Sequence, residues 1–244
     1  MPIRRTAPCP CGSGSRYKDC CGEISRYSAQ ELRFDGIDFA EVARLVGRDD
    51  PVVLDVGSND GNIAREFLRV FPRCRLIAFE PDPRAIARWR ASIQDPRATL
   101  IECAIGAAEG RATFHQSSGQ PEPGASADWD KSGSLRAPKT HLQTWPWCRF
   151  ETTIEVPVSP LDRWTGELGL DRVDFLWADV QGAESDLIAG ARETLRRTRF
   201  FHTEYTNAEW FEGQIDLPAM RALLPDFEIV KLFADDVLFR RRTA

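Results

Sequence analysis

A glycine-containing loop and two carboxylates are the residues of this chain best suited to chemistry. The loop Asp55-Val-Gly-Ser-Asn-Asp-Gly61 follows the apolar run 52–54, and Glu80 closes a second apolar run nineteen residues after Gly61. Glycine lets the backbone approach a ligand closely, and a carboxylate after the second strand of an α/β unit can accept hydrogen bonds from ribose hydroxyls. The pattern therefore predicts a nucleoside-containing cofactor, either a dinucleotide or S-adenosylmethionine.

The sequence of the loop distinguishes between these two candidate cofactors. A dinucleotide loop needs the pattern G-x-G-x-x-G so that the pyrophosphate can approach a helix N-terminus. Here Asn59 stands in place of the central glycine, and Asp60 would repel a phosphate. S-adenosylmethionine has no phosphate and carries a sulfonium and an ammonium, so acidic neighbours favour it. The sequence thus favours S-adenosylmethionine.

Four cysteines at the N-terminus form a second group with chemical potential. Cys9, Cys11, Cys20 and Cys21 fall within thirteen residues. Four thiolates suit tetrahedral Zn²⁺, and so short a piece can fold only around a metal or through cross-links. We predict a zinc knuckle over residues 1–23, with a disulfide pair or unstructured thiols as the alternative. Residues 24–36 are then a linker, and 37–244 form the main domain.

The main domain must position these residues through alternating strands and helices. Apolar β-branched runs predict strands, at 52–56, 75–80, 98–103, 110–115, 152–158, 173–178 and 199–205. Helical periodicity and capping residues predict helices between them, from Ile63 to Phe71, 83–93, 160–168, 187–195 and 217–224. The alternation predicts an α/β fold with a mostly parallel, doubly wound sheet. Runs at 227–233 and 237–240 predict a C-terminal antiparallel hairpin.

Ordered motifs along most of the main domain resemble the FkbM-type S-adenosylmethionine-dependent methyltransferases, a class I Rossmann-like family. They are D-V-G-S-N-D-G at 55–61, F-E-P-D-P at 79–83, A-I-G at 104–106, S-G-S-L at 132–135, V-P-V-S-P-L-D at 156–162 and D-V-Q-G-A-E at 179–184. The chain departs from the family at Gln181, where glutamate is usual. The resemblance implies methylation of hydroxyl oxygens on sugars, polyketides and related metabolites.

The cysteine cluster is similar to the zinc knuckle at the C-terminus of the SecA translocation ATPase, the SEC-C motif. Its pattern C-x-C-x-S-G-x(5–6)-C-[CH] is matched by Cys9, Cys11, Ser13, Gly14, Cys20 and Cys21. This resemblance implies a structural zinc and a protein partner for the knuckle.

The family resemblance also implies roles for single residues. Gly57, Asn59 and Gly61 are expected to line the methionine part of the cofactor, Glu80 to hold the ribose, and the loop 103–105 to flank the adenine. The complete expected cofactor set is Asp55, Gly57, Ser58, Asn59, Gly61, Glu80, Pro81, Ala104, Ile105 and Asp179.

A hydroxyl acceptor would benefit from a nearby base. Strand ends offer Asp179, Glu204 and His202 as catalytic candidates. Glu184 and the other two of the three histidines, His115 and His141, are further candidates.

The segment 116–150 shows no long periodicity. It is rich in serine, glycine and proline and contains Trp129, Trp145 and Trp147. Because tryptophans are costly to leave in water, we predict a mobile lid over the acceptor site, with a rigid loop packed on a sheet edge as the alternative.

The composition and net charge of the chain limit the kinds of partner that it can bind. The 244 residues carry a net charge of -5, with 42% hydrophobic and 28% charged residues, which is typical of a folded soluble domain. The acidic balance argues against general binding to nucleic acid or to anionic membranes. No membrane-spanning run or cleaved signal is visible, so we expect a cytoplasmic protein acting on a small-molecule acceptor. N-methylation and a non-catalytic adaptor role remain the alternatives to O-methylation.

Overall fold

The computed structural model describes residues 6–7, 16, 37–121 and 128–242. The predicted zinc ligands Cys9, Cys11, Cys20 and Cys21 and the predicted linker lie outside the described residues. In the described part, no helix is both long and apolar enough to cross a membrane.

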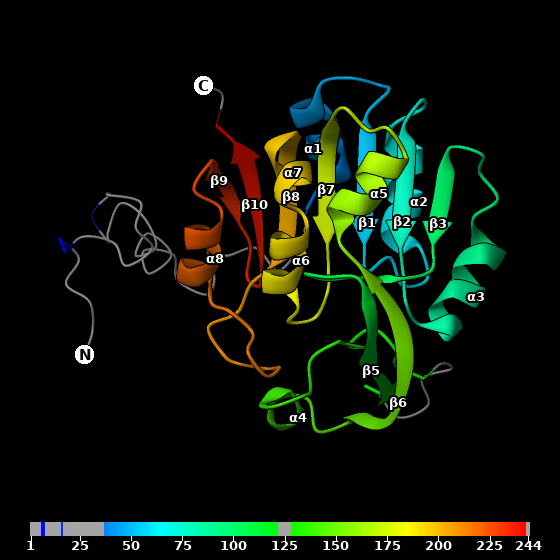
Figure 1. The fold of residues 1–244 in the computed structure, drawn as a ribbon, viewed down its shortest axis with the longest axis vertical. Coiled ribbons are helices and arrows are strands. Elements are labelled where there is room, and N and C mark those ends of the chain that lie inside the picture. Colours follow the sequence, from blue (N-terminus) through cyan, green and yellow to red (C-terminus); the bar gives the residue numbers. More distant parts are fainter. Residues whose placement is uncertain (1–5, 8–15, 17–36, 122–127, 243–244) are drawn as a thin grey trace.

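A seven-stranded sheet forms the centre of the main domain (Figure 1). Its strand order is β3-β2-β1-β7-β8-β10-β9, and the pairs among β3, β2, β1, β7 and β8 are parallel. The strands span Val52–Val56 (β1), Arg75–Phe79 (β2), Ala98–Ile101 (β3), Val173–Ala178 (β7), Thr198–Glu204 (β8), Phe227–Leu232 (β9) and Asp236–Arg241 (β10). The predicted α/β doubly wound sheet is therefore confirmed.

The C-terminal hairpin is also confirmed. Strand β10 runs antiparallel to both β8 and β9, and the amide of Phe233 donates to the carbonyl of Asp236 across the turn at 2.9 Å. The carboxyl end of β10 therefore lies at the edge of the sheet where the parallel strands begin.

Helices cover both faces of this sheet (Figure 1). One face packs against α1 (Phe39–Val46), α2 (Asn62–Val70) and α3 (Pro83–Ser92), and the other against α5 (Leu161–Glu167), α6 (Glu184–Gly190), α7 (Arg192–Arg196) and α8 (Leu217–Leu223). Asp82 accepts a hydrogen bond from the Arg84 amide and Pro83 begins α3, as the capping pattern predicts. The predicted helix over 187–195 is interrupted at Ala191 and forms α6 and α7 instead.

A separate three-stranded sheet lies beyond the carboxyl ends of the main strands (Figure 1). Its strands are β4 (Ala104–Ile105), β5 (Gly110–Gly119) and β6 (Cys148–Ser159), in the order β4-β6-β5. The expectation that 116–150 lacks regular elements was wrong at both ends, because β5 extends to Gly119 and β6 begins at Cys148. A short helix, α4 (His141–Thr144), also forms within this segment. Cross-strand pairing between β5 and β6, which no local periodicity reveals, stabilises these ends.

Candidate functional site

A cleft opens at the carboxyl ends of β1, β2 and β7. It encloses about 970 Å³ of space, counting its open mouth. Loops 56–63, 79–81 and 177–183 contribute to its walls, together with residues of 103–105 and Phe114. Parallel sheets place ligands at this edge because all of their loops converge there.

The loop after β1 is held against the end of β7 by Gly57. This glycine has φ 81°, and a Cβ built on it would lie 1.8 Å from the carbonyl oxygen of Asp179. The amides of Gly57 and Ser58 both donate to the carbonyl oxygen of Phe79, at 2.9 and 3.0 Å. Glycine at this position therefore lets the three strand ends meet around the cleft.

Two of the expected cofactor residues lie behind this loop and do not line the cleft. Asp55 is fully buried, and its Oδ2 accepts a 2.6 Å hydrogen bond from the hydroxyl of Ser58. Burial raises the pKa of Asp55 to about 7. Gly61, at φ 81°, begins α2, and a Cβ there would lie 2.5 Å from Ile93 and 2.8 Å from Trp89. Both residues thus shape the loop from within the core.

Glu80 lines the cleft and is 4% exposed. Its Oε2 accepts from the Asn59 amide and its Oε1 from the Asp82 amide, each at 2.8 Å. Burial raises the pKa of Glu80 to about 8. Each carboxylate oxygen has a second lone pair, so Glu80 is fixed in position and can still accept hydrogen bonds from a ligand.

Asn59 presents an unused acceptor in the same cleft. Its amide nitrogen donates to the carbonyl of Asp130 at 3.2 Å, whereas its buried Oδ1 has no partner. A buried carbonyl oxygen without a partner is costly, and an ammonium group of a ligand would satisfy it. The cleft is lined by the carboxylates of Asp60, Glu80, Asp130 and Asp179 against the single ammonium of Lys131. These residues therefore fit a cofactor that carries a sulfonium and an ammonium.

The other expected cofactor residues that line the cleft are Gly57, Ser58, Pro81, Ala104, Ile105 and Asp179.

Asp179, directly after β7, belongs to a hydrogen-bonded row of polar side chains. The amide nitrogen of Gln181 donates to Asp179 Oδ1 at 2.6 Å and to Glu204 Oε2 at 2.9 Å. Burial raises the pKa of Asp179, and burial together with the charge of Asp179 raises that of Glu204 well above its usual range. Asp179 and Gln181 line the cleft; Glu204 is not part of the lining and reaches it only through Gln181.

Glu184 is buried at the start of α6, where its Oε1 accepts from the Gly182 amide at 3.1 Å. Burial raises its pKa to about 7. It supports the turn after β7 and is not among the cleft residues.

The structure places His202 away from the cleft. Its ring stacks on Trp177 with centroids 3.9 Å apart, it is 1% exposed, and neither ring nitrogen has a partner. Burial lowers its pKa to about 3. His202 is therefore a neutral core residue behind Trp177, which disagrees with its expected role as a base. His141 is similarly enclosed by Trp145, Phe150 and Phe211, and burial lowers its pKa to about 4.

The segment 128–140 crosses the cleft from the three-stranded sheet. Its Asp130, Lys131, Gly133 and Leu135 line the cleft, although the sequence offered only the S-G-S-L motif as a sign of this. Ser134 donates to the carbonyl of Gln181 at 2.6 Å.

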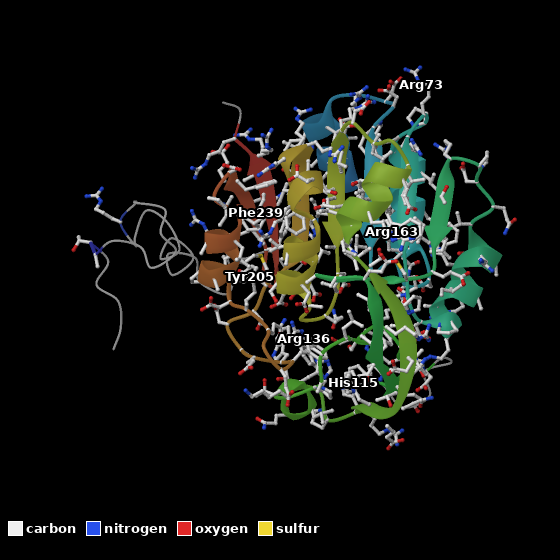
Figure 2. The ribbon with its side chains drawn as sticks, viewed as in Figure 1. Arg73, His115, Arg136, Arg163, Tyr205 and Phe239 are labelled. Atoms are coloured by element: carbon white, nitrogen blue, oxygen red, sulfur yellow. The ribbon has the colours of Figure 1, made fainter. Side chains whose placement is uncertain are left out.

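Two further contacts connect this crossing segment to the rest of the protein. Arg136 pairs with Asp186 of α6, and the backbones of Ser134 and His115 form a bridge. Figure 2 shows Arg136 between the base of α6 and the three-stranded sheet. The segment is thereby attached both to the main domain and to β5.

The three tryptophans of 116–150 pack on neighbouring aromatic rings. Trp129 and Trp147 make an edge contact at 5.3 Å, and Trp145 contacts Trp210 and His141, each at 4.7 Å. These contacts agree with the alternative of a packed loop, while the mobility of the segment stays a prediction.

Comparison with known proteins supports the cofactor chemistry. Residues 55–232 match the methyltransferase FkbM domain, and residues 5–23 match the SEC-C motif. The 2-O-methyltransferase NoeI of Sinorhizobium fredii is 48% identical over 205 residues, which cover 82% of this chain and 83% of NoeI. The AMB antimetabolite synthetase AmbE of Pseudomonas aeruginosa is 29% identical over 198 residues, or 73% of this chain and 9% of AmbE.

Among solved structures, fibrillarin of Aeropyrum pernix with bound S-adenosyl-L-methionine aligns at a TM-score of 0.45 and 14% identity, over 83% of this chain and 74% of that one. The sequence matches extend over most of the main domain and include the residues that line the cleft around Glu80 and Asp179. The chain therefore belongs to the FkbM family of methyltransferases.

Proposed function

We propose that this methyltransferase uses S-adenosylmethionine to methylate a hydroxyl oxygen of a small, sugar-type molecule. The observation that carries the proposal is the buried, acid-lined cleft around Glu80 in a chain that is 48% identical to a 2-O-methyltransferase. When bound, the cofactor supplies an electrophilic methyl group on sulfur. The acceptor oxygen would take this methyl group, the electron pair of the S–CH₃ bond would remain on sulfur, and a carboxylate of the cleft would take the hydroxyl proton.

Different residues of the cleft would bind different parts of the cofactor. Glu80 would accept hydrogen bonds from the ribose, and the unpartnered Oδ1 of Asn59 would accept from the ammonium. Ala104 and Ile105 supply an apolar surface suited to the adenine. Asp55 and Gly61 act as positioning residues, because they fix the loop on which Asn59 lies.

Asp179 is our candidate for the proton acceptor. It lines the cleft beyond the end of β7, and burial raises its pKa above that of an ordinary aspartate, which makes its ionised form a stronger base. Gln181 opposes part of this rise by donating to Asp179. Glu204 acts as a positioning residue, since its carboxylate holds the Gln181 amide from the far side.

The reaction is tested with a ¹³C-methyl donor and a panel of sugar acceptors, with the product analysed by NMR. We expect a labelled methyl group on oxygen. A label on nitrogen would replace the proposal with N-methylation. If the protein bound the cofactor but transferred its methyl group to no acceptor tested, the non-catalytic adaptor role would be favoured.

The role of Asp179 has its own test. Asp179→Asn should lower kcat by about a hundredfold or more, the usual contribution of a general base, and Asp171→Asn on the exposed surface should not. An unchanged kcat in Asp179→Asn would remove this residue from the chemistry.

We further propose that Cys9, Cys11, Cys20 and Cys21 hold one structural zinc ion and that this knuckle binds a protein partner. The support is the match of residues 5–23 to the SEC-C motif and the four thiols themselves. Elemental analysis should give one zinc per chain in the wild type and loss of zinc in a variant with Cys20→Ser and Cys21→Ser. Absence of zinc from the wild-type protein would reject the metal site.

A further inference from the structure

A groove lined by arginines lies at the opposite edge of the main sheet from the cleft. It is formed by the beginning of β8, the end of β10 and the residues next to them (Figure 1). Because β10 is antiparallel to β8, its carboxyl end meets the amino end of β8 at this edge. We call it the arginine groove; its lining residues are Arg197, Thr198, Arg199, Glu228, Arg240, Arg241 and Arg242.

The groove is positively charged, whereas the whole protein is negatively charged. Five arginines and one glutamate give a local charge of +4, whereas the full chain carries -5. Like charges that share a groove repel one another, so the arrangement disfavours the unbound state. An anionic partner would relieve this repulsion.

Neutral acceptors hold two of the guanidinium groups in place. Arg197 donates to the carbonyl of Leu170 at 2.8 Å, and Arg199 donates to the carbonyl of Val46 at 2.7 Å. These carbonyls restrict the side chains without neutralising them. In the part of the chain that the structure describes, no carboxylate pairs with Arg197, Arg199, Arg241 or Arg242.

Glu228, which also lines the groove, pairs with Arg240 across β9 and β10. Its Oε1 accepts from Arg240 Nε at 2.9 Å and also from Arg240 Nη2. A carboxylate thus already lies on one guanidinium of the groove, and Arg241 and Arg242, both exposed, offer the same fork-shaped donor to further carboxylates.

The side chains that line the groove make single-stranded nucleic acids and anionic membranes poor candidates for its ligand. Among the residues that the structure describes, no aromatic ring lines the groove, so it offers the bases of a single-stranded nucleic acid no stacking surface. The same described residues include no apolar side chain that could insert into a lipid bilayer.

We propose that the arginine groove binds an acidic segment, rich in glutamate and aspartate, of a partner protein. This binding is separate from methyl transfer, because the groove and the cleft lie at opposite edges of the sheet. The partner would therefore recruit the enzyme and leave the cleft open to its acceptor.

The test uses the full chain and a fluorescent oligoglutamate peptide, with affinity measured by anisotropy at low and high salt. A variant with Arg241→Gln and Arg242→Gln should bind the peptide about tenfold more weakly or worse, since it loses two charge-assisted contacts. The control variant carries Arg111→Gln and Arg149→Gln on the exposed strands β5 and β6, which removes the same charge elsewhere. It should bind like the wild type, and both variants should retain methyltransferase activity.

Each remaining outcome rejects the proposal. Absence of peptide binding by the wild type at low salt would show that the groove has no such ligand. Equal weakening in both variants would show only general charge attraction. Tighter binding of an oligouridine RNA, or of phosphatidylserine vesicles, would assign the groove to nucleic acid or to membranes instead.

Discussion

At the scale of single residues, the main electrostatic feature of this protein is that several carboxyl groups are buried and have raised pKa values. Burial raises the pKa of Asp55 and Glu184 to about 7 and that of Glu80 to about 8. Buried acids of this kind gather at functional sites, where a bound cation or donor later compensates them. Here only Glu80 of the three lines the cleft.

Glu80→Ala should weaken S-adenosylmethionine binding about tenfold or more, because it removes the buried acceptor of the ribose hydrogen bonds, each worth about 0.5–1.5 kcal/mol. Calorimetry measures the change. Glu102→Ala, an exposed acid nearby, is the control and should bind normally. Unchanged affinity in Glu80→Ala would exclude this residue from the cofactor site.

Gln181→Leu should move the acidic limb of the kcat–pH profile to higher pH. Gln181 donates to Asp179 and so lowers its pKa; without this donor the pKa rises, and a higher pH is needed to ionise the base. Gln143→Leu, exposed on α4, is the control. If both variants kept the wild-type profile, Asp179 would not be the titrating base.

Asp55→Asn should flatten the dependence of unfolding free energy on pH. The pKa of Asp55 is about 7 in the folded protein against an ordinary 3.8, so between these values the folded state retains a proton that the unfolded state has lost, and stability falls as pH rises. Each pH unit of separation is worth about 1.4 kcal/mol, and asparagine does not titrate. Denaturant unfolding at pH 4 and pH 7 measures the difference, which we expect to be on the order of 3 kcal/mol. Equal slopes in the two proteins would contradict the shifted pKa.

At the scale of elements, the cleft depends on two sheets that meet at one edge. The main sheet supplies the loops after β1, β2 and β7, and the three-stranded sheet supplies the segment that crosses them. Residues 137–141 attach that segment to the loop after β8: Lys139 N donates to Trp210 O at 2.7 Å, and Glu212 N donates to Ala137 O at 2.9 Å. The crossing segment is thus also fixed to the loop after β8, whose Phe211 packs against Gly182 beside the cleft.

Trp145→Ala should impair methyl transfer while leaving S-adenosylmethionine affinity nearly unchanged. Trp145 packs on His141 and Trp210 and does not line the cleft, so its loss should loosen the crossing segment without touching the cofactor residues. Leu142→Ala, exposed at 43% on α4, is the control. Limited proteolysis complements the kinetics: a mobile lid would be cleaved within 116–150 in the free protein and protected with S-adenosylhomocysteine, whereas equal resistance would indicate a packed loop.

At the scale of the whole molecule, the candidate binding sites lie in separate regions. The cleft lies at the carboxyl edge of the sheet and the arginine groove at the opposite edge. The SEC-C match at 5–23 precedes the FkbM match at 55–232 without overlap. The division into a knuckle at 1–23, a linker at 24–36 and a catalytic domain at 37–244 is consistent with these bounds and stays a prediction.

A chain that begins at Ser25 should bind S-adenosylmethionine with wild-type affinity. The described residues that line the cleft all lie between Val56 and Ala183, so we expect the shortened chain to keep these contacts with the cofactor. Calorimetry on the shortened and complete chains makes the comparison. A loss of affinity in the shortened chain would show that the knuckle contributes to the active site.

The sequence by itself determined the fold class and the central part of the site. Apolar runs of strand length, the glycines of 55–61 and the carboxylates at strand ends are local patterns, and the convergence of parallel strand ends is a general rule. These patterns predicted Glu80 and Asp179 at the strand ends, the resemblance to the FkbM family added Asn59 and Ala104, and the structure places all four at the cleft.

Only the tertiary structure decided which polar residues face the cleft. Asp55 accepts a hydrogen bond from Ser58 behind the loop, and Gly61 packs against Trp89 and Ile93. Trp89 and Ile93 lie on or beside α3, which is distant from Gly61 in sequence. Alternation along β8 and the packing of Trp177 put His202 in the core. Asp130 and Lys131 reach the cleft because β5 and β6 pair into a second sheet, and such long-range pairing leaves no local pattern in the sequence.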